Sequence, residues 1–421
     1  MNSYQVFKFG GASVKDAEGI KNVANIVGNF SSEKLLIVVS AMGKTTNALE
    51  VLLEKSRNDE DYSAALNELR DFHTTIIDDL GGGSVVDLKN EINKQLSYLE
   101  KLLPITKKHS YDYSYDLIVS QGEILSTKIV SGYLNTKGFN NQWLDVREYI
   151  KTNNTHRDSK VLWDETITKV RLELKGVLDK NPVVTQGFIG SSRNGNTTTL
   201  GREGSDFSAA ILAYCLECDK LTIWKDVEGI LSADPKKFDN PTKIEKLSFH
   251  EALEMTYFGA KVLHPKTIKP LQNKDIALEV KSFKNYNKTG TLINSIASDN
   301  ELPPIIVRKE NQVLVSFTTT DFSFIAEDHL SEIFTCLAKH RVKINLMQNS
   351  ARSFSICTGS TGNRAQKVID DLQEHFDILT NEDLQLLTIR HYTDEKVEEL
   401  VKGKEVLLEQ KTRNTVQLIL K

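Results

Sequence analysis

The sequence predicts an α/β protein in which helices cover both faces of a mostly parallel sheet, followed by smaller α+β modules of ferredoxin-like order. Short apolar runs of strand length alternate with helix-patterned segments up to about residue 294. Several of these runs end in glycine, lysine or a hydroxyl residue, as strands do where an open sheet binds its ligand. Beyond residue 304, strand and helix patterns follow a β-α-β-β order and then begin again.

Size and composition place limits on the function. The chain has 421 residues, 39% of them apolar and 26% charged, with a net charge of -4. Two or three domains fit this length, and the charge gives no general attraction to nucleic acid or to anionic membranes. Four cysteines are too few for a disulfide framework. The N-terminal residues do not have the pattern of a secretory signal peptide, and no apolar stretch is long enough to span a bilayer. We therefore expect a cytoplasmic protein without nucleic-acid or membrane partners.

The stretch Lys8–Val14 follows an apolar strand pattern. Gly10 and Gly11 let backbone N–H groups approach an anion without interference from a Cβ atom, and Lys8 and Ser13 add a cation and a hydroxyl. An ordinary Gly-Gly turn is the alternative at this point. Taken with the rest of the chain, we interpret the stretch as a phosphate-binding turn.

Two further segments of this half have clear patterns. The apolar run Leu35–Ser40 leads to Gly43–Thr45, which resembles the end of a P-loop, but the first glycine of that motif would fall at Val38, inside the strand. The P-loop interpretation therefore fails, and Thr45 is expected at the ligand-binding edge of the sheet. From Tyr62 to Leu103, apolar residues recur every three or four positions, which predicts a helical hairpin.

Glu123 follows the apolar residues from Leu117 and precedes a helical pattern, so we expect it near a helix N-terminus. The helix dipole would stabilise a carboxylate there by about 0.3–1 kcal/mol, which explains the residue without any function. The functional alternative is that Glu123 holds a cationic group of a substrate.

A second dense site is Leu200–Asp206, placed directly before a helix expected from Phe207. Ser205 and Asp206 are suited to capping that helix. Capping does not require Arg202, whose forked guanidinium binds carboxylates or phosphates through two parallel hydrogen bonds. Farther along, Lys225–Lys236 and Lys261 mix turn residues with cations, as suits the rim of a nucleotide site.

Five ordered motifs together resemble those of aspartate kinases (aspartokinases) of the amino acid kinase superfamily. The motifs are Lys8–Val14, Ser120–Glu123, Thr198–Asp206, Trp224–Ile230 with Ala233–Pro235, and Phe258–Pro265. The resemblance spans about residues 4 to 294 and implies the amino acid kinase fold. It also implies transfer of a phosphoryl group from MgATP to the β-carboxylate of L-aspartate. The product would be 4-phospho-L-aspartate, at the first step toward lysine, threonine, methionine and isoleucine.

The resemblance implies a role for each matched residue. Catalysis falls to Lys8 and to Asp206, which orients Lys8. Residues matched to aspartate binding are Thr45, Glu123, Arg202 and Ser205. Residues matched to ATP binding are Lys8, Gly10, Gly11, Ser13, Lys225, Asp226, Leu231, Lys236, Lys261 and Val262. No protein ligand to a metal is expected, because Mg²⁺ comes with ATP, and the ionised acceptor carboxylate needs no general base.

Some positions depart from the family pattern. Many relatives have threonine, tyrosine and arginine where this chain has Lys225, Leu231 and Lys236, so Leu231 lacks an aromatic contact to ATP and Lys236 lacks a bidentate fork. Glu203 stands where relatives often have glycine or asparagine, which leaves open whether the position needs a positive φ. We expect the Glu203 side chain to point outward.

The C-terminal part resembles paired ACT domains, the effector-binding modules of aspartokinases. We expect a catalytic domain over 1–296, a first ACT domain over 305–380 and a truncated second module over 381–421, joined by a polar, proline-ended linker. A homodimer through the ACT region is implied. The candidate effector residues are Ser323 and Phe324 in the loop Phe322–Asp328, with Asn349 and Ser350 opposite. Lysine is the first candidate effector. Threonine or no regulation stays as the alternative, because Ala351 stands where lysine-sensitive relatives commonly have a glutamate.

Two other functions stay open. A different amino acid kinase, acting on N-acetylglutamate or glutamate, shares the sheet and the phosphate turn. An amino-acid sensor with an inactive kinase domain is the second alternative. The joint presence of Lys8, Glu123, Arg202 and Asp206 argues against the sensor, which has no use for all four.

Overall fold

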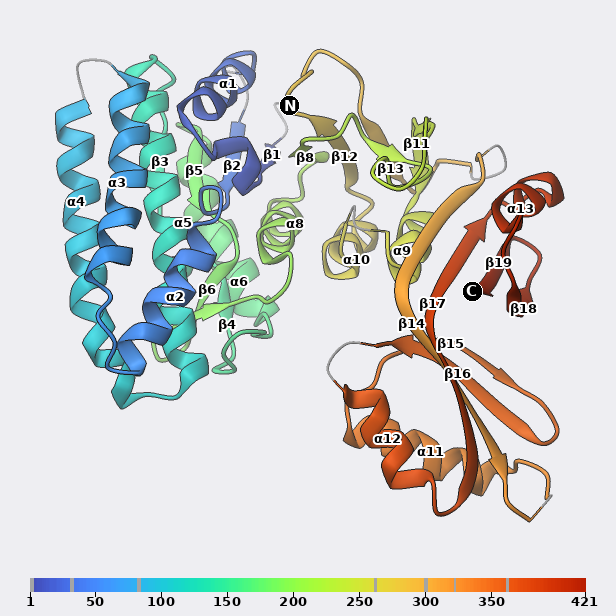
Figure 1. The fold of residues 1–421 in the computed structure, drawn as a ribbon. Helices are drawn as coiled ribbons and strands as arrows, with labels where there is room; N and C mark the ends of the chain where they lie inside the picture. Colours follow the sequence, from blue (N-terminus) through green and yellow to red (C-terminus); the bar gives the residue numbers. More distant parts are fainter. Residues whose placement is uncertain are drawn as a thin grey trace. The chain divides into compact units, whose positions relative to one another are not determined.

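The computed structural model describes residues 4–30, 34–81, 85–260, 263–298, 302–321, 323–360 and 363–421 (Figure 1). These residues form two compact units. The first lies within 1–230, 245–253 and 262–299, and the second within 231–244, 254–261 and 300–421.

The first unit is built on an eight-stranded sheet of order β11-β13-β12-β8-β1-β2-β5-β3. Neighbouring strands are parallel except for β12 and β13, which confirms the mostly parallel sheet. The strands are β1 Tyr4–Phe9, β2 Lys34–Val39, β3 Gln142–Leu144, β5 Val183–Gln186, β8 Lys220–Lys225, β11 Lys246–Ser248, β12 Ala277–Ser282 and β13 Thr291–Asn294. In register, Phe9 of β1 pairs with Val39 of β2 and Trp224 of β8, so these three strands end together.

Helices cover both faces of this sheet. Side chains alternate between the faces of a strand, and those of Phe7, Phe9 and Ile37 join one core with α1 to α5. Helix α8 packs against β1 and β8, and α10 packs against α8. The helices are α1 Ala17–Gly28, α2 Thr45–Arg57, α3 Ser63–Leu80, α4 Val85–Leu102, α5 Tyr111–Thr136, α6 Trp163–Lys169, α7 Lys175–Leu178, α8 Gly204–Leu216, α9 Phe249–Phe258 and α10 Pro265–Asn273.

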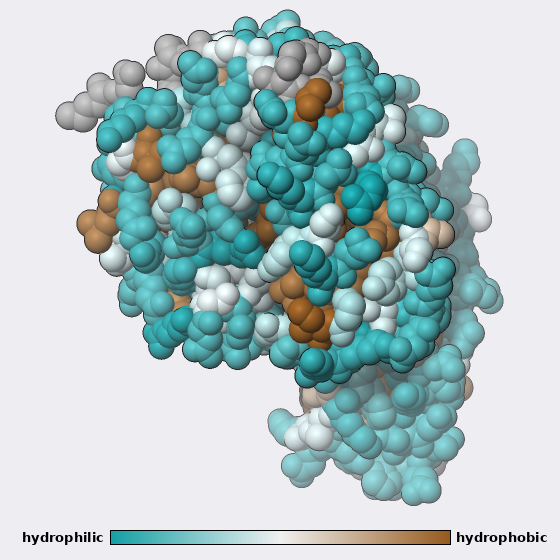
Figure 2. Space-filling view, turned by 90° about the vertical axis from the view of Figure 1, so that its left-hand side faces the viewer, coloured by the Kyte–Doolittle hydropathy of each residue, from teal (hydrophilic) through white to brown (hydrophobic). Residues whose placement is uncertain are grey.

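The predicted helical hairpin is confirmed as α3 and α4, which lie side by side in Figure 1. Figure 2 views this side, and its surface is mostly hydrophilic with scattered apolar spots. Phe72 of α3 and Tyr98 of α4 are among the exposed apolar side chains of these helices, and Phe72 lines a small apolar pocket with Val51 of α2.

A small sheet lies beside the main one and leads into the second dense motif. It consists of β4 Lys151–Thr152, β6 Ile189–Ser192 and β7 Thr197–Thr199. The hairpin of β6 and β7 turns at Gly195, whose φ is 77°. Strands β5 and β6 are separated by a backbone bend at Phe188, whose φ is 71°.

The second unit carries a six-stranded antiparallel sheet of order β15-β16-β14-β17-β19-β18. The chain order of strands and helices repeats as predicted, with α11 and α12 side by side (Figure 1). Its elements are β9 Ile230–Leu231, at the junction of the units, β10 Lys243–Ile244, β14 Ile305–Thr319, α11 Glu327–Lys339, β15 Ile344–Asn349, β16 Ser353–Gly359, α12 Arg364–Leu372, β17 Phe376–Arg390, α13 Asp394–Val401, β18 Val406–Lys411 and β19 Thr415–Leu420.

Strand β17 pairs with β14 and continues through residues 380 and 381, where the boundary between the two predicted modules lies. Both copies of the repeated strand and helix pattern therefore share one sheet. The predicted domain boundaries of 1–296, 305–380 and 381–421 stay a prediction. None of the helices in the described part of the chain is both long and apolar enough to cross a bilayer.

Candidate active site

A cleft of about 590 Å³ lies where β1, β2 and β8 end, a volume typical of small-molecule sites. Its walls come from the ends of these strands, the start of α2, α5, the turn around residue 157, the bend at Phe188 and the start of α8. Its lining residues are Lys8, Gly11, Ser40, Ala41, Gly43, Thr46, Tyr115, Glu123, Arg157, Phe188, Gly201, Arg202, Glu203, Gly204, Ser205, Asp206 and Lys225.

Asp206 binds two lysines in this cleft. Its Oδ1 lies 2.7 Å from Lys8 Nζ, and its Oδ2 lies 3.5 Å from Lys225 Nζ. Burial by itself would raise the pKa of Asp206, which is 4% exposed, but the two ammonium groups hold that pKa below its ordinary value. The carboxylate therefore stays ionised and holds Lys8 and Lys225 toward the same space.

The turn after β1 requires a glycine at position 11. A Cβ atom on Gly11 would lie 2.6 Å from the Ala41 carbonyl oxygen, and one on Gly10 would lie 3.3 Å from Lys8 Nζ. The Gly43 N–H donates to the Gly11 carbonyl over 3.1 Å, which ties this turn to the end of β2. Gly11 faces the cleft, whereas Gly10 and Ser13 support the turn without lining it.

Helix α8 begins at Gly204, so Ser205 and Asp206 lie within its first turn, and the predicted start at Phe207 is wrong. Gly201 and Glu203 have φ values of 77° and 53°, and this left-handed geometry turns the chain into the helix. The N–H groups of the first helical turn and the positive end of the helix dipole face the cleft, which favours an anion there.

The expectation that Glu203 points outward is wrong. Its side chain lines the cleft, and its Oε2 is buried without a hydrogen-bond partner among the described residues. The φ of 53° shows that the position does adopt the left-handed conformation that glycine and asparagine favour. A glutamate here costs backbone energy and adds negative charge beside an anion site.

Glu123 lies in the middle of α5, Tyr111–Thr136, so the prediction of a helix N-terminus is wrong and the dipole does not explain the residue. The apolar residues before it belong to the same buried helix. Glu123 is 3% exposed, and burial raises its pKa to about 8 against the opposing effects of the Ala41 N–H and the Lys8 charge. Its Oε2 has no hydrogen-bond partner within the described residues. A buried acceptor of this kind suits an incoming ammonium group.

Arg202 lies at the cleft and is exposed. Its guanidinium donates no hydrogen bond to the described residues, so its whole fork is available to an anion. Arg202, Glu123, Ser205, Asp206, Lys8, Gly11 and Lys225 are thus the predicted site residues that one cleft brings together.

The sequence analysis missed Arg157 and Tyr115 of this cleft. The Arg157 guanidinium lies 4.4 Å from the centre of the Tyr115 ring, and its backbone N–H donates to Asp116. Asp116 is fully buried and also accepts from Thr199 Oγ1 over 2.6 Å. The available signal was an acid next to the apolar run Leu117–Val119, because a buried acid needs a partner from elsewhere in the chain.

Other predicted site residues lie outside the cleft. Thr45 begins α2, and its Oγ1 is 3.5 Å from His73 Nε2, whereas its neighbour Thr46 lines the cleft. Asp226 is exposed. Leu231 and Lys236 belong to the second unit, and Lys261 and Val262 lie outside the described residues.

The candidate effector residues lie on two adjoining loops of the second unit. The Ile325 N–H donates to the Ala351 carbonyl over 3.0 Å, which places the loop of Ser323 and Phe324 against that of Asn349 and Ser350. Phe324 is 70% exposed. Phe322 lies outside the described residues.

Lysines and a glycine turn at parallel strand ends, set opposite a helix N-terminus, define a phosphotransferase for a small anionic acceptor. The amino acid kinase family matches residues 3–282. Lysine-sensitive aspartokinase 3 of Escherichia coli strain K12 is 33% identical over 86% of this chain and 80% of its own length. The chain belongs to the amino acid kinase family, and within it to the aspartokinases.

Further comparisons agree with this assignment. A bifunctional aspartokinase/homoserine dehydrogenase 2 of Arabidopsis thaliana is 30% identical over 89% of this chain, which spans only 42% of that relative. The structure of E. coli aspartokinase III in complex with aspartate and ADP has a TM-score of 0.81 at 28% identity, over 99% of this chain and 96% of that one. The complex of the same enzyme with lysine and aspartate has the same TM-score and identity, over 99% of this chain and 95% of that one.

Proposed function

We propose that this chain transfers the γ-phosphoryl group of MgATP to the β-carboxylate of L-aspartate. The observation that carries the proposal is one cleft that combines the Lys8–Asp206–Lys225 group with Glu123 and Arg202. Relatives named aspartokinases, and a related structure holding aspartate and ADP, support this choice of substrates.

Aspartate has two carboxylates and one ammonium group, and the cleft offers a group for each. Arg202 presents an unoccupied guanidinium, and Arg157 adds a second cation stacked on Tyr115. Glu123 presents a buried oxygen without a partner among the described residues. Binding through two arginines and one acid would fix the acceptor carboxylate relative to the phosphates.

Phosphoryl transfer requires charge neutralisation more than covalent help. Lys8 and Lys225 would neutralise the phosphates, and the Gly11 turn and the first-turn amides of α8 would donate to their oxygens. Asp206 would act as a positioning residue, since it holds both lysines. The acceptor oxygen is already an anion, so no residue needs to remove a proton.

Magnesium would enter with the nucleotide. Of the acids that line the described cleft, Asp206 is paired with two lysines, and Glu123 and Glu203 are single carboxylates. Mg²⁺ commonly keeps several waters and binds phosphate oxygens beside one or two carboxylates, which this cleft permits. When bound, Mg²⁺ neutralises negative charge on the phosphates.

The experiment is a coupled ADP-release assay with MgATP and a panel of acceptors. Aspartate should support turnover, and glutamate and N-acetylglutamate should not. Turnover with either of the other acids instead would indicate a different amino acid kinase. ATP binding without turnover on any acceptor would indicate a sensor.

Replacing Arg202 by alanine should raise the KM for aspartate at least tenfold, because a charge-assisted pair is worth about 1.5–3 kcal/mol. The change removes a cleft guanidinium that donates no hydrogen bond to the described residues. Steady-state kinetics measure the effect, with Arg193→Ala as control, since Arg193 is exposed and pairs with Glu165. An unchanged KM for aspartate would show that the carboxylate binds elsewhere.

Glu123 should make aspartate binding depend on pH. Because its pKa is about 8 in the empty cleft, Glu123 is mostly protonated at neutral pH, and an arriving ammonium group favours the ionised form. The KM for aspartate should therefore fall as pH rises toward about 8 and level off above it. The measurement is KM against pH for the wild type and Glu123→Gln. The variant should have a higher KM without this dependence, and an equal dependence in both proteins would refute the assignment.

We also propose that the second unit binds an amino-acid effector at the joined loops around Phe324 and Ser350, with lysine as the first candidate. A related structure holding lysine supports this choice, and coupling free energies of about 1–3 kcal/mol are typical of such regulation. Activity assays with lysine and threonine, alone and combined, test this proposal. Kinase activity that does not change with either amino acid would rule out the proposed regulation. The homodimer and the cytoplasmic location stay predictions.

A further inference from the structure

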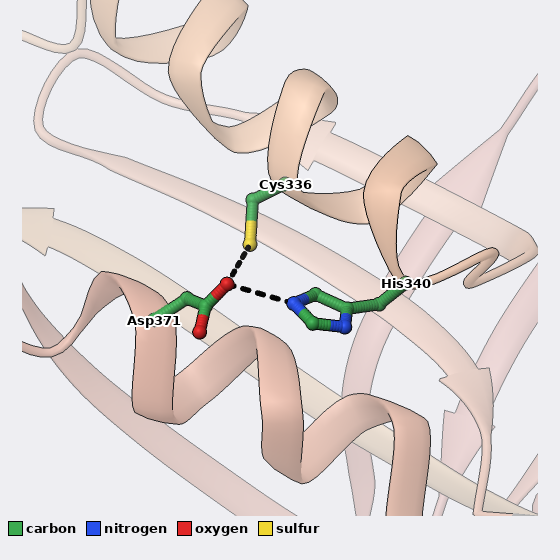
Figure 3. A group of neighbouring side chains, drawn as sticks. All are labelled: Cys336, His340 and Asp371. Carbon is green, nitrogen blue, oxygen red and sulfur yellow. Dashed lines mark hydrogen bonds and ion pairs between the residues drawn. The ribbon is translucent and has the colours of Figure 1, made fainter.

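A cluster of metal-ligating side chains lies in the second unit, far in sequence from the kinase cleft. Cys336, His340 and Asp371 each offer one ligand atom, and these atoms all lie within 4.8 Å of one another. Figure 3 shows the three side chains pointing toward a common point, the first two from α11 and its C-cap and the third from α12. The kinase reaction uses none of them.

The cluster is placed by helix geometry. Cys336 and His340 are four residues apart and therefore share a face of α11. Cys336 is 7% exposed, and the His340 side chain is 15% exposed, so the thiol and the ring lie at the contact between the helices. Glu332 lies one turn before Cys336 on the same face of α11. Its carboxylate hydrogen-bonds to the ring of His375, just after α12, so a second contact joins this face of α11 to the α12 segment.

The distances are close to those that a tetrahedral ion requires. Asp371 Oδ2 lies 2.7 Å from His340 Nε2 and 3.9 Å from Cys336 Sγ. Zinc bonds of about 2.0–2.3 Å with tetrahedral angles place such pairs about 3.3 and 3.5 Å apart. Each of these two separations needs to change by roughly half an ångström, which side-chain torsions provide, and the thiol and ring of Cys336 and His340 lie within 4.8 Å of each other.

We propose that Cys336, His340 and Asp371 bind a divalent transition-metal ion, with zinc as the best match, and that the ion links α11 to α12. A thiolate, an imidazole and a carboxylate are the zinc ligands found in proteins, and three of them leave a fourth position for water. The site is new relative to the kinase activity and does not depend on it.

Lys339 competes with the ion. Its Nζ lies 2.7 Å from Asp371 Oδ2, the oxygen assigned to the metal. The Lys339 side chain is 66% exposed, so it is free to move into solvent when the ion binds. Removing this ammonium should therefore strengthen metal binding. Nonspecific binding of the ion to surface side chains would not show this effect.

The test is calorimetric titration of the chelator-treated, reduced full chain with ZnCl₂, followed by Co²⁺ binding monitored through the thiolate-to-cobalt absorption band. The wild type should bind one equivalent. Cys336→Ser and Asp371→Asn should each weaken binding at least tenfold and Cys336→Ser should also remove the band, whereas Lys339→Ala should tighten binding. Cys357→Ser is the matched control, since Cys357 is also a buried cysteine of this unit and should leave both readouts unchanged.

Circular dichroism would show that each variant is folded. Equal zinc affinity in the wild type and Cys336→Ser, or no binding by the wild type, would overturn the proposal. The cluster would then be only a hydrogen-bonded contact between two helices.

Discussion

Replacing Lys8 by methionine should lower kcat by about 10²–10³-fold, the range measured when one preorganised group that stabilises transition-state charge is lost. Lys8 is 8% exposed and pairs with Asp206 at the end of β1, so its loss removes a buried positive charge from the phosphate site. The KM for aspartate should change much less, because other residues are assigned to that substrate. Single-turnover kinetics with saturating MgATP measure the effect.

Lys101→Met is the control for this variant. Lys101 is an exposed lysine in the last turn of α4, and its loss should leave kcat unchanged. If Lys8→Met kept the wild-type kcat, Lys8 would be a structural partner of Asp206 and the phosphate site would lie elsewhere.

Replacing Asp206 by asparagine should impair both catalysis and stability. The Lys8 and Lys225 ammoniums would then share a buried space without their common counter-ion. Breaking a buried pair by removing one partner costs about 3–5 kcal/mol, so urea unfolding should shift to clearly lower concentrations. The fall in kcat should exceed tenfold, because Lys8 would no longer be held in place.

The stability effect has a defined dependence on pH. Because the folded pKa of Asp206 is below its unfolded value near 3.8, its contribution is present above that value and is lost as pH falls through the folded pKa. The wild type and Asp206→Asn should therefore differ in unfolding free energy at neutral pH and converge in strong acid. Asp79→Asn, which changes an exposed acid on α3, should show no such difference.

Much of this site is predictable because local sequence determines it. A strand that ends in lysine and two glycines, and a helix that begins near Ser205 and Asp206, are readable from spacing and residue type. Parallel strand ends meet at one edge of a sheet, so the sequence also predicts that Lys8 and Lys225 meet.

The failures have one physical cause: tertiary packing overrides local pattern. Residues 117–119 are as apolar as a strand because the middle of α5 is buried, and this hid Glu123 in the middle of a long helix. Arg157 is held by Asp116 from a helix some forty positions earlier. Glu203 points inward because its left-handed backbone sets its direction, which composition does not reveal.

The most direct test of the central claim is to trap the product of the reaction with aspartate and MgATP by hydroxylamine, which converts acyl phosphates to hydroxamates. The account predicts aspartate β-hydroxamate in an amount equal to the ADP released, and its loss in Lys8→Met. Release of ADP with inorganic phosphate and no hydroxamate, or hydroxamate from glutamate in place of aspartate, would contradict it.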